Sequence, residues 1–192
     1  MKGPPFAPPK LASIIVEALE DRVHPAYGQA ATVGSRGRPQ ARTVHWRWLP
    51  ERGTLGFNAH VRSPKWRQLR RVPELSGVYH DATRLIQLRW EASVELVDFK
   101  AKASGDRAML DRAWALMRPE VRLAYWRDWA AAKTRDVAPR CPNLGLAVCR
   151  PRVWDVFVLH PKDYNKGRRT IYELKSGVWR SSKVSLLHSR PV

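Results

Sequence analysis

Four cationic side chains, Arg42, Arg47, Arg62 and Lys65, lie where the sequence predicts strand ends and the start of a helix. Ser63-Pro64 directly precedes Lys65, and serine at the cap with proline at the first helical position is typical of a helix N-terminus. The free N–H groups of that terminus, its partial positive charge and the neighbouring ammonium group suit a phosphate. A phosphorylated cofactor is therefore the first hypothesis for this region. An ordinary capped surface helix is the alternative.

The two arginines of the expected strand pose a geometric question. Arg42 and Arg47 have opposite parity, so a regular strand points them to opposite faces. Both reach one ligand only if the ligand wraps around a strand end or if a bulge intervenes; otherwise one of them is exposed to solvent. Gln87 stands in an apolar strand, where a buried amide needs hydrogen-bond partners. These partners are either backbone groups of a neighbouring strand or the polar atoms of a heterocyclic ligand.

Other common catalytic or metal-binding patterns are missing from the sequence. The six histidines form no HxxxH or HxH pair, which argues against a metal site. There is no GxSxG elbow and no evident Cys–His motif. Cys141 and Cys149 fit neither a zinc pattern nor a redox CxxC pair, so we expect two free thiols, with a disulfide as the alternative.

Composition favours one compact domain. The chain has 192 residues, 44% of them apolar and nine of them tryptophan, which is enough for an aromatic core. No apolar run approaches the roughly 18 residues of a membrane span, and the proline-rich start resembles no signal peptide. We therefore expect a cytoplasmic protein that does not cross a membrane.

The formal net charge of +18 is far above the magnitude of about 2–8 that is usual for a small domain. Such an excess predicts attraction to polyanions. Arginine-rich coding in a GC-rich genome would give the same number. Tryptophans interleaved with arginines, in Trp46-Arg47-Trp48 and Trp66-Arg67, are compatible with stacking on single-stranded nucleic acid, although several of these rings are expected to face a core.

The periodicity of apolar residues predicts a mainly β domain with a few helices. Closely spaced strands favour an antiparallel meander over βαβ units, and the sum is a β-barrel with helices packed on it. We expect an N-terminal arm and helix over residues 1–27, with residues 1–9 mobile, a barrel domain over 28–187 and a tail over 188–192. The expected helices are 11–22, 63–71 and 104–129 with a break near Pro119. A loop is expected at 133–143, and strands at 28–33, 40–49, 54–58, 75–80, 84–99, 144–159, 168–174 and 179–187.

At this point the sequence resembles a known family. The runs GRPQARTVHWRW, GTLGFNAHVRSPKWRQLRRVPELSGVYH and RLIQLRWEASVEL are similar to the FMN-binding core of the pyridoxamine 5′-phosphate oxidase-like split barrels. PNLGLAVCRPRVWDVFVL, GRRTIYEL and WRSSKVSLL are similar to that family's closing strands. The resemblance implies a six-stranded antiparallel Greek-key split barrel, a homodimer, and FMN held at the dimer interface.

The resemblance also implies which residues bind the cofactor. The predicted FMN-binding residues are Arg42, Thr43, Val44, Arg47, Asn58, Arg62, Ser63, Lys65, Gln87 and Arg169. The oxidases of this family place Tyr, Arg and Ser at four-residue intervals on a helix that binds pyridoxal phosphate, and the matching positions here are Trp114, Arg118 and Arg122. Their Arg-x-His motif is matched by Asn165 and Gly167, and their flavin-packing Trp by Leu159 or Phe157.

The expected function is electron or hydride transfer between bound FMN and a small anionic or aromatic substrate. Such chemistry needs a substrate stacked on the flavin ring and no obligatory protein acid or base. A flavin- or haem-binding module without turnover is one alternative, and a basic nucleic-acid-binding barrel is another.

Overall fold

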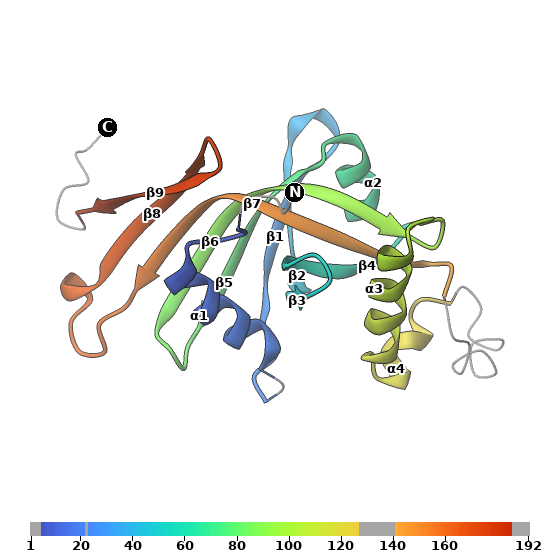
Figure 1. The fold of residues 1–192 in the computed structure, drawn as a ribbon, viewed down its shortest axis with the longest axis horizontal. Coiled ribbons are helices and arrows are strands. Elements are labelled where there is room, and N and C mark those ends of the chain that lie inside the picture. The colour runs from blue at the N-terminus through green and yellow to red at the C-terminus, as the bar shows by residue number, and fades with distance from the viewer. Residues whose placement is uncertain (1–4, 22, 127–140, 186–192) are drawn as a thin grey trace.

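The computed structural model describes residues 5–21, 23–126 and 141–185. Within these residues nine strands form one antiparallel sheet (Figure 1). The strands are β1 (Tyr27–Val33), β2 (Pro39–His45), β3 (Arg47–Leu49), β4 (Thr54–His60), β5 (Glu74–Asp81), β6 (Ile86–Asp98), β7 (Leu144–Val158), β8 (Arg168–Lys175) and β9 (Val178–Val184). The helices are α1 (Pro9–Glu20), α2 (Pro64–Arg71), α3 (Ser104–Ala115), α4 (Pro119–Leu123) and the short 3-10 turns Ser35–Gly37 and Tyr164–Lys166.

The order of the strands shows that the sheet wraps around. The order is β2-β1-β5-β6-β7-β4-β3, so β2 and β3 lie at its two ends. Only Trp46 separates these two strands in the chain, and its backbone N–H donates to Ala26 O at 2.9 Å. The two ends of the sheet must therefore meet at Trp46, as they do in a split barrel.

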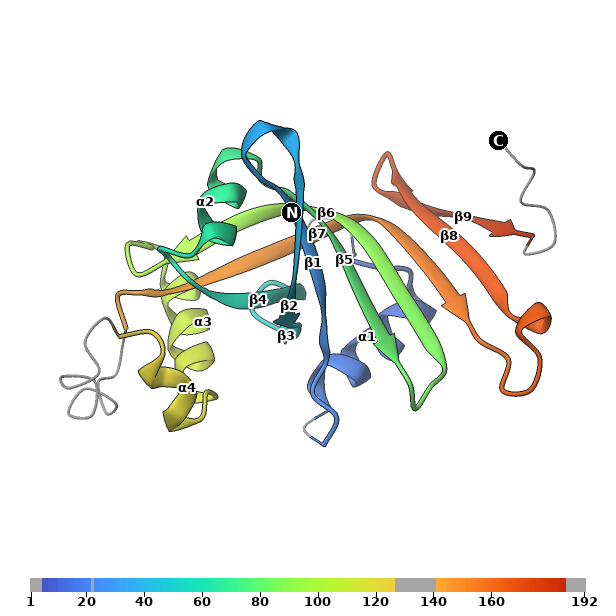
Figure 2. The same ribbon diagram turned by 180° about the vertical axis from the view of Figure 1, so that it is seen from behind.

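This architecture confirms the expected fold class, a mainly β domain with flanking helices. The sheet has nine strands where six were expected for the barrel. One reason is that the expected strand 40–49 divides at Trp46; another is that the β8–β9 hairpin pairs with the far end of β7 and extends beyond the barrel (Figures 1 and 2). The expected loop at 133–143 lies mostly outside the described residues.

Aromatic rings fill the barrel. Trp46 and Trp154 are fully buried, and the ring of Trp90 lies 4.5 Å from the first and 5.2 Å from the second, centroid to centroid. Gly77 lies against this stack, since a Cβ atom there would come within 2.2 Å of the Trp90 ring. The core therefore explains both the tryptophan content and the glycine in the middle of β5.

The helices cover the sheet with apolar faces. The buried residues of α1 are Leu11, Ile15, Ala18 and Leu19, so one side of the helix faces the sheet. Trp66 and Leu69 of α2 belong to the same core. On the other face of β7, α3 packs a second cluster, which includes Trp114, over Leu146 and Val148.

The first described residues are docked, so the expectation of a mobile start is wrong for residues 5–9. Phe6 packs against Trp48 with ring centroids 4.9 Å apart, and Ala7 is fully buried. The indole N–H of Trp154 donates to Phe6 O at 2.9 Å, and that of Trp179 donates to Pro5 O at 2.8 Å. Two indoles from the second half of the chain therefore hold the proline-rich segment in place.

Pro151 coincides with a local irregularity inside one long strand. The pairing of β6 with β7 shifts register between Glu91 and Ala92, and Ala92 faces Pro151. Proline has no N–H to give to a ladder and is accommodated at bulges.

Among the described helices, none is long and apolar enough to cross a membrane.

Candidate phosphate and cofactor site

The helix start predicted at Ser63-Pro64 is confirmed. Ser63 is the N-cap of α2, and its Oγ accepts the Trp66 backbone N–H at 3.4 Å. The Ser63 N–H in turn donates to His60 O at 2.9 Å, so the turn after β4 sets the direction of the helix. Lys65 lies in the first turn. Arg62 is exposed, and its backbone N–H donates to the His60 ring at 3.1 Å.

Arg42 points to the side of the sheet on which α2 packs. Its Nη1 donates to Thr32 Oγ1 at 2.6 Å and to Ala30 O at 3.1 Å, and its Nη2 donates to Gln68 Oε1 at 2.8 Å. Thr32 Oγ1 also donates to Gln68 Oε1 at 2.6 Å. The guanidinium is thus fixed by β1 on one side and by α2 on the other, with neutral partners only.

Lys65 and Arg42 bring two positive charges together without a counter-charge. Burial lowers the pKa of Lys65, and the nearby guanidinium of Arg42 lowers it further. Burial also lowers the pKa of Arg42. Neither side chain pairs with a carboxylate in the part of the chain that the structure describes. Two partly buried cations at a helix N-terminus form a site that an anion would stabilise.

Arg47 faces the opposite side of the strand, as its parity predicts. Its Nη2 lies 3.2 Å from His45 Nδ1, and Tyr125 and Tyr27 are its other polar neighbours. Burial lowers the pKa of Arg47. Arg47 Nε and Asn58 Oδ1 are buried and have no hydrogen-bond partner among the described residues. Such groups are costly unless a ligand or water satisfies them, so each of these two atoms needs a partner that the described residues do not supply.

The other two predicted cofactor residues of β2, Thr43 and Val44, also point to opposite faces of the strand. Val44 is buried opposite Gly28, whereas Thr43 is exposed opposite Gln29. Arg42 and Val44 therefore share one face of β2, and Thr43 lies on the other.

His45 is held in its neutral form. Burial and the neighbouring Arg47 lower its pKa from 6.5 to about 4. Because the folded-state pKa is depressed, this contribution to stability is complete above pH 6.5 and is lost as the pH falls toward about 4. We expect the unfolding free energy of the wild type to fall between pH 7 and pH 4.5 by on the order of 1 kcal/mol more than that of His45→Gln, after allowance for solvent screening. Urea unfolding at both pH values checks this, and equal losses in the two proteins would contradict it.

Gln87 and Arg169 lie on the sheet face opposite Arg42. Across the sheet, Arg42 pairs with Ala30, Ala30 pairs with Gly77, and Gly77 pairs with Trp90. Because Ala30 and Trp90 are buried, this cross-strand row faces the core. Gln87 has the opposite parity in β6 and shares a cross-strand row with Phe157 and Arg169. The fold therefore does not bring Gln87 and Arg169 to the Arg42–Lys65 site within one chain.

Arg169 is part of an ion cluster on that outer face. Its Nε and Nη2 donate to the two oxygens of Asp155 at 2.9 and 2.8 Å, and Arg89 donates to the same carboxylate. Burial opposes ionisation of Asp155, but the hydrogen bonds from the two arginines outweigh it and lower its pKa.

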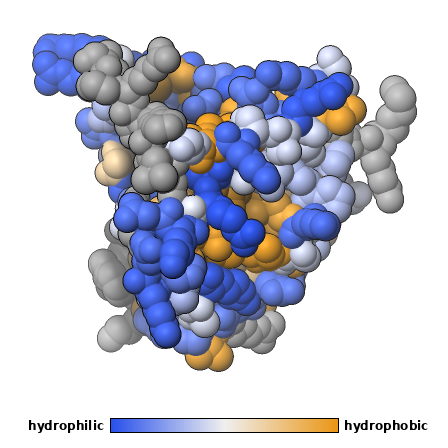
Figure 3. All heavy atoms as spheres, turned by 90° about the vertical axis from the view of Figure 1, so that its left-hand side faces the viewer, coloured by the Kyte–Doolittle hydropathy of each residue, from blue (hydrophilic) through white to orange (hydrophobic). Residues whose placement is uncertain are grey.

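A groove also runs between α1 and the β8–β9 hairpin. It is lined by apolar residues of α1 and β7 and by Arg168 and Lys183. The face of the molecule on the β8–β9 side carries an apolar patch among hydrophilic side chains (Figure 3).

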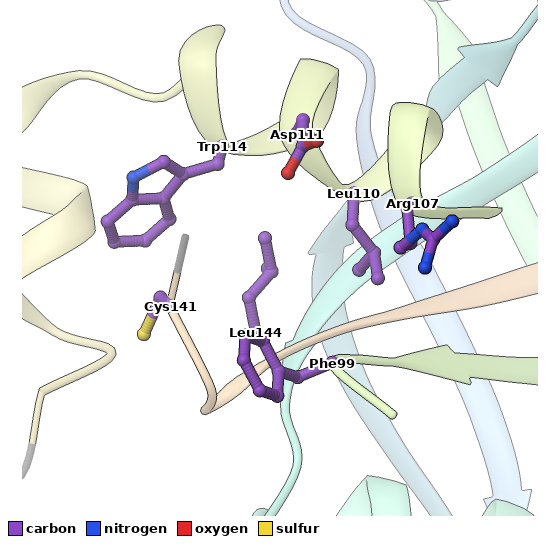
Figure 4. A pocket seen from close by; sticks show the side chains of 7 residues that line it. All are labelled: Phe99, Arg107, Leu110, Asp111, Trp114, Cys141 and Leu144. Carbon is purple, nitrogen blue, oxygen red and sulfur yellow. The ribbon is translucent and has the colours of Figure 1, made fainter. Parts of the chain in front are cut away.

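The three expected substrate residues make contacts within the protein. Trp114 is buried and lines a small pocket with Phe99, Leu110 and Cys141 (Figure 4). Arg122 Nε donates to Trp114 O at 3.1 Å, and its guanidinium lies 5.5 Å from the Trp114 ring. Arg118 is exposed and lies 3.9 Å from Glu120. The fold therefore brings Trp114 and Arg122 together, whereas Arg118 lies beside Glu120 at the surface. Cys141 and Cys149 are free and buried, as expected.

Sequence reasoning missed Thr32, Gln68 and Tyr125. Gln68 lies three residues after Lys65 on α2, which places it on nearly the same side of the helix and was a usable signal. Thr32 and Tyr125 carried none, because their roles depend on strand pairing and on the packing of α4. No group of three or more possible metal ligands occurs among the residues described.

This wrapped sheet, with a cationic site at the start of α2, has the fold of the pyridoxamine 5′-phosphate oxidase-like FMN-binding split barrels. The resemblance expected from the sequence is thereby confirmed. No protein-family model matches the chain. It is 28% identical over 111 residues to pyridoxine/pyridoxamine 5′-phosphate oxidase 2 of Arabidopsis thaliana. That alignment covers 57% of this chain and 56% of the relative, so the chain matches about half the length of this curated protein.

Two solved structures share the fold over nearly the whole chain. A pyridoxamine 5′-phosphate oxidase-related FMN-binding protein from Nostoc punctiforme has a TM-score of 0.77 and 22% identity, covering 93% of this chain and 98% of its own. PhzG from Burkholderia lata, solved with tetrahydrophenazine-1-carboxylic acid, has a TM-score of 0.67 and 18% identity, covering 92% of this chain and 88% of its own.

Proposed function

We propose that the protein binds FMN and acts as an FMN-dependent oxidoreductase on a small anionic or aromatic substrate. The observation that carries the proposal is the pair Arg42 and Lys65, two partly buried cations without a carboxylate partner among the described residues. An FMN phosphate carries the charge that this pair lacks, and the α2 N-terminus adds N–H donors. FMN is supported further because the structurally similar protein from Nostoc punctiforme is an FMN-binding protein.

Different residues would bind different parts of the cofactor. Arg42, Lys65 and Ser63 would hold the phosphate, and Arg47 and Asn58 offer unsatisfied polar atoms to the rest of the cofactor or to the substrate. Bound FMN supplies hydride or electron transfer. The chain's own part is to bind and orient the cofactor, and neutral His45 keeps a second positive charge away from Arg47.

A homodimer belongs to the same proposal. Gln87 and Arg169 face away from Arg42 within one chain, so they reach the cofactor only if a second copy presents its outer sheet face. We place the protein in the cytoplasm, which agrees with its two free thiols.

A visible absorption spectrum tests the proposal. The purified protein, or the protein after addition of FMN, is expected to show the bound-flavin bands, and a colourless protein that takes up no FMN would end the proposal. Bleaching of those bands by NADH or NADPH distinguishes an oxidoreductase from a flavin-binding module without turnover.

Gln68 provides a test of how Arg42 is oriented. In Gln68→Glu the new carboxylate would pair with Arg42 and compete with the phosphate, so we expect FMN affinity to fall by roughly tenfold. Riboflavin, which lacks the phosphate, should bind as it does to the wild type. Parallel fluorescence titrations check this, and equal losses for both ligands would show a structural defect instead.

The pH dependence of FMN binding should report Lys65. Its pKa lies below the ordinary 10.5 in the free protein, and a bound phosphate favours the ammonium form. Affinity is therefore expected to fall as the pH rises through that lowered pKa. In Lys65→Arg, whose charge does not titrate, the decline should disappear. An unchanged pH profile in Lys65→Arg would exclude Lys65 as the titrating group.

A further inference from the structure

Six exposed arginines gather on one small surface around α2. They are Arg36, Arg38, Arg62, Arg67, Arg70 and Arg71. Arg71 Nη2 donates to Gly34 O and, at 3.3 Å, to Val33 O, which fixes the end of α2 against the β1–β2 turn that carries Arg36 and Arg38. Figures 1 and 2 show the helix and this turn side by side. We call these six residues the α2 basic patch.

The α2 basic patch differs in its ion pairing from eight other described arginines. None of its six members forms an ion pair with any carboxylate in the described ranges. Eight arginines elsewhere do form such pairs: Arg52, Arg84, Arg89, Arg112, Arg118, Arg150, Arg152 and Arg169. Between residues 22 and 73 the sequence has eleven Arg or Lys and a single acidic residue, Glu51. Arginine-rich coding alone raises the number of arginines, but it does not keep acidic residues away from one surface.

The chemistry of the patch fits a polymer of phosphates. Arg67, Arg70 and Arg71 are spaced i, i+3, i+4 and so lie along one face of α2. A single small anion satisfies two or three guanidinium groups, whereas six separate ones match the repeated phosphates of a nucleic-acid backbone. Trp46 and Trp66 are buried, so they offer no platform for unpaired bases. Contacts to the phosphates of a duplex, without base stacking, are what this surface can make.

We propose that the α2 basic patch binds the phosphate backbone of a nucleic-acid duplex, independently of sequence and of flavin binding. Contacts of this kind release counterions from the duplex. In a plot of the logarithm of affinity against the logarithm of salt concentration, each contacted phosphate therefore contributes a slope of about −0.9. For four to six contacts we expect a slope between about −3.6 and about −5.4.

The experiment compares two variants with the same loss of charge. The first replaces Arg36, Arg38, Arg67 and Arg70 by glutamine, which leaves the expected cofactor residues untouched. The control replaces Arg112, Arg150, Arg152 and Arg180, which are exposed arginines outside the patch. Fluorescence anisotropy with labelled DNA and RNA duplexes of about 20 base pairs, over a salt series, gives affinity and slope. The same titration with anionic phospholipid vesicles tests the other phosphate-rich partner.

The patch variant is expected to lose at least about 30-fold in duplex affinity at 0.1 M salt and about three units of slope. The control should change by less than about threefold, and FMN uptake should be equal in both variants. Equal losses in the two variants would mean that only net charge matters, and would overturn the proposal. It would also be overturned by absence of duplex binding at 0.1 M salt, or by binding to vesicles and not to duplexes.

Discussion

Lys65→Glu is expected to weaken FMN binding by about 1,000-fold or more. The substitution removes one charged contact to the phosphate, and each such contact is worth about 1.5–3 kcal/mol. The new carboxylate would also pair with Arg42, the cation that now faces Lys65. One substitution therefore takes both cations away from the phosphate.

The same change should leave the protein without ligand as stable as the wild type or more stable, since a repulsion becomes an attraction. FMN and riboflavin titrations with thermal unfolding of the ligand-free protein separate the two effects. Lys100→Glu, an exposed charge reversal outside the site, is the matched control. An FMN affinity within about threefold of the wild type would place the phosphate elsewhere and remove the basis of the proposed function.

Trp46→Ala is expected to produce the largest loss of stability, about 3–5 kcal/mol. Trp46 is fully buried, and its ring packs at 4.5 Å from Trp90 and at 5.3 Å from Phe57, centroid to centroid. It is also the single residue between β2 and β3, so it joins the segments that carry Arg42 and Arg47. Loosening this junction should reduce flavin binding as well.

Urea unfolding measures the first effect, and FMN titration below the unfolding range measures the second. The control is Trp179→Ala, which removes the same side chain from the less buried β9 and should cost less than half as much. A loss of under about 1 kcal/mol for Trp46→Ala would show that the junction does not depend on this ring.

Local patterns in the sequence were sufficient for the parts of the site that depend on neighbouring residues. The Ser63-Pro64 signal predicts the start of α2, and parity predicts that Arg42 and Arg47 point apart; both hold. The apolar strand around Gln87 predicts a buried amide, but the residue is half-buried because the outer face of β6 carries polar side chains.

The other features of the site depend on which strands pair with each other. Strand pairing joins residues far apart in the chain, so local sequence patterns do not predict it. The Arg42–Thr32–Gln68 network needs β1 beside β2 and α2 across their ends. The separation of Gln87 and Arg169 from Arg42 appears only when the rows of the sheet are traced across several strands. The split of the expected strand at Trp46 has the same origin, because closing the barrel requires a sharp change of direction there.

The docked N-terminal segment has a consequence for how the protein is made. Pro5 and Phe6 are synthesised well before their hydrogen-bond partners, Trp179 and Trp154, which follow 174 and 148 residues later. Contacts between such distant positions form late and slow folding. The proline-rich segment therefore docks only after β7 and β9 have been synthesised. Growth temperature and chaperone supply should influence the yield of this protein more than that of a helical protein of equal length.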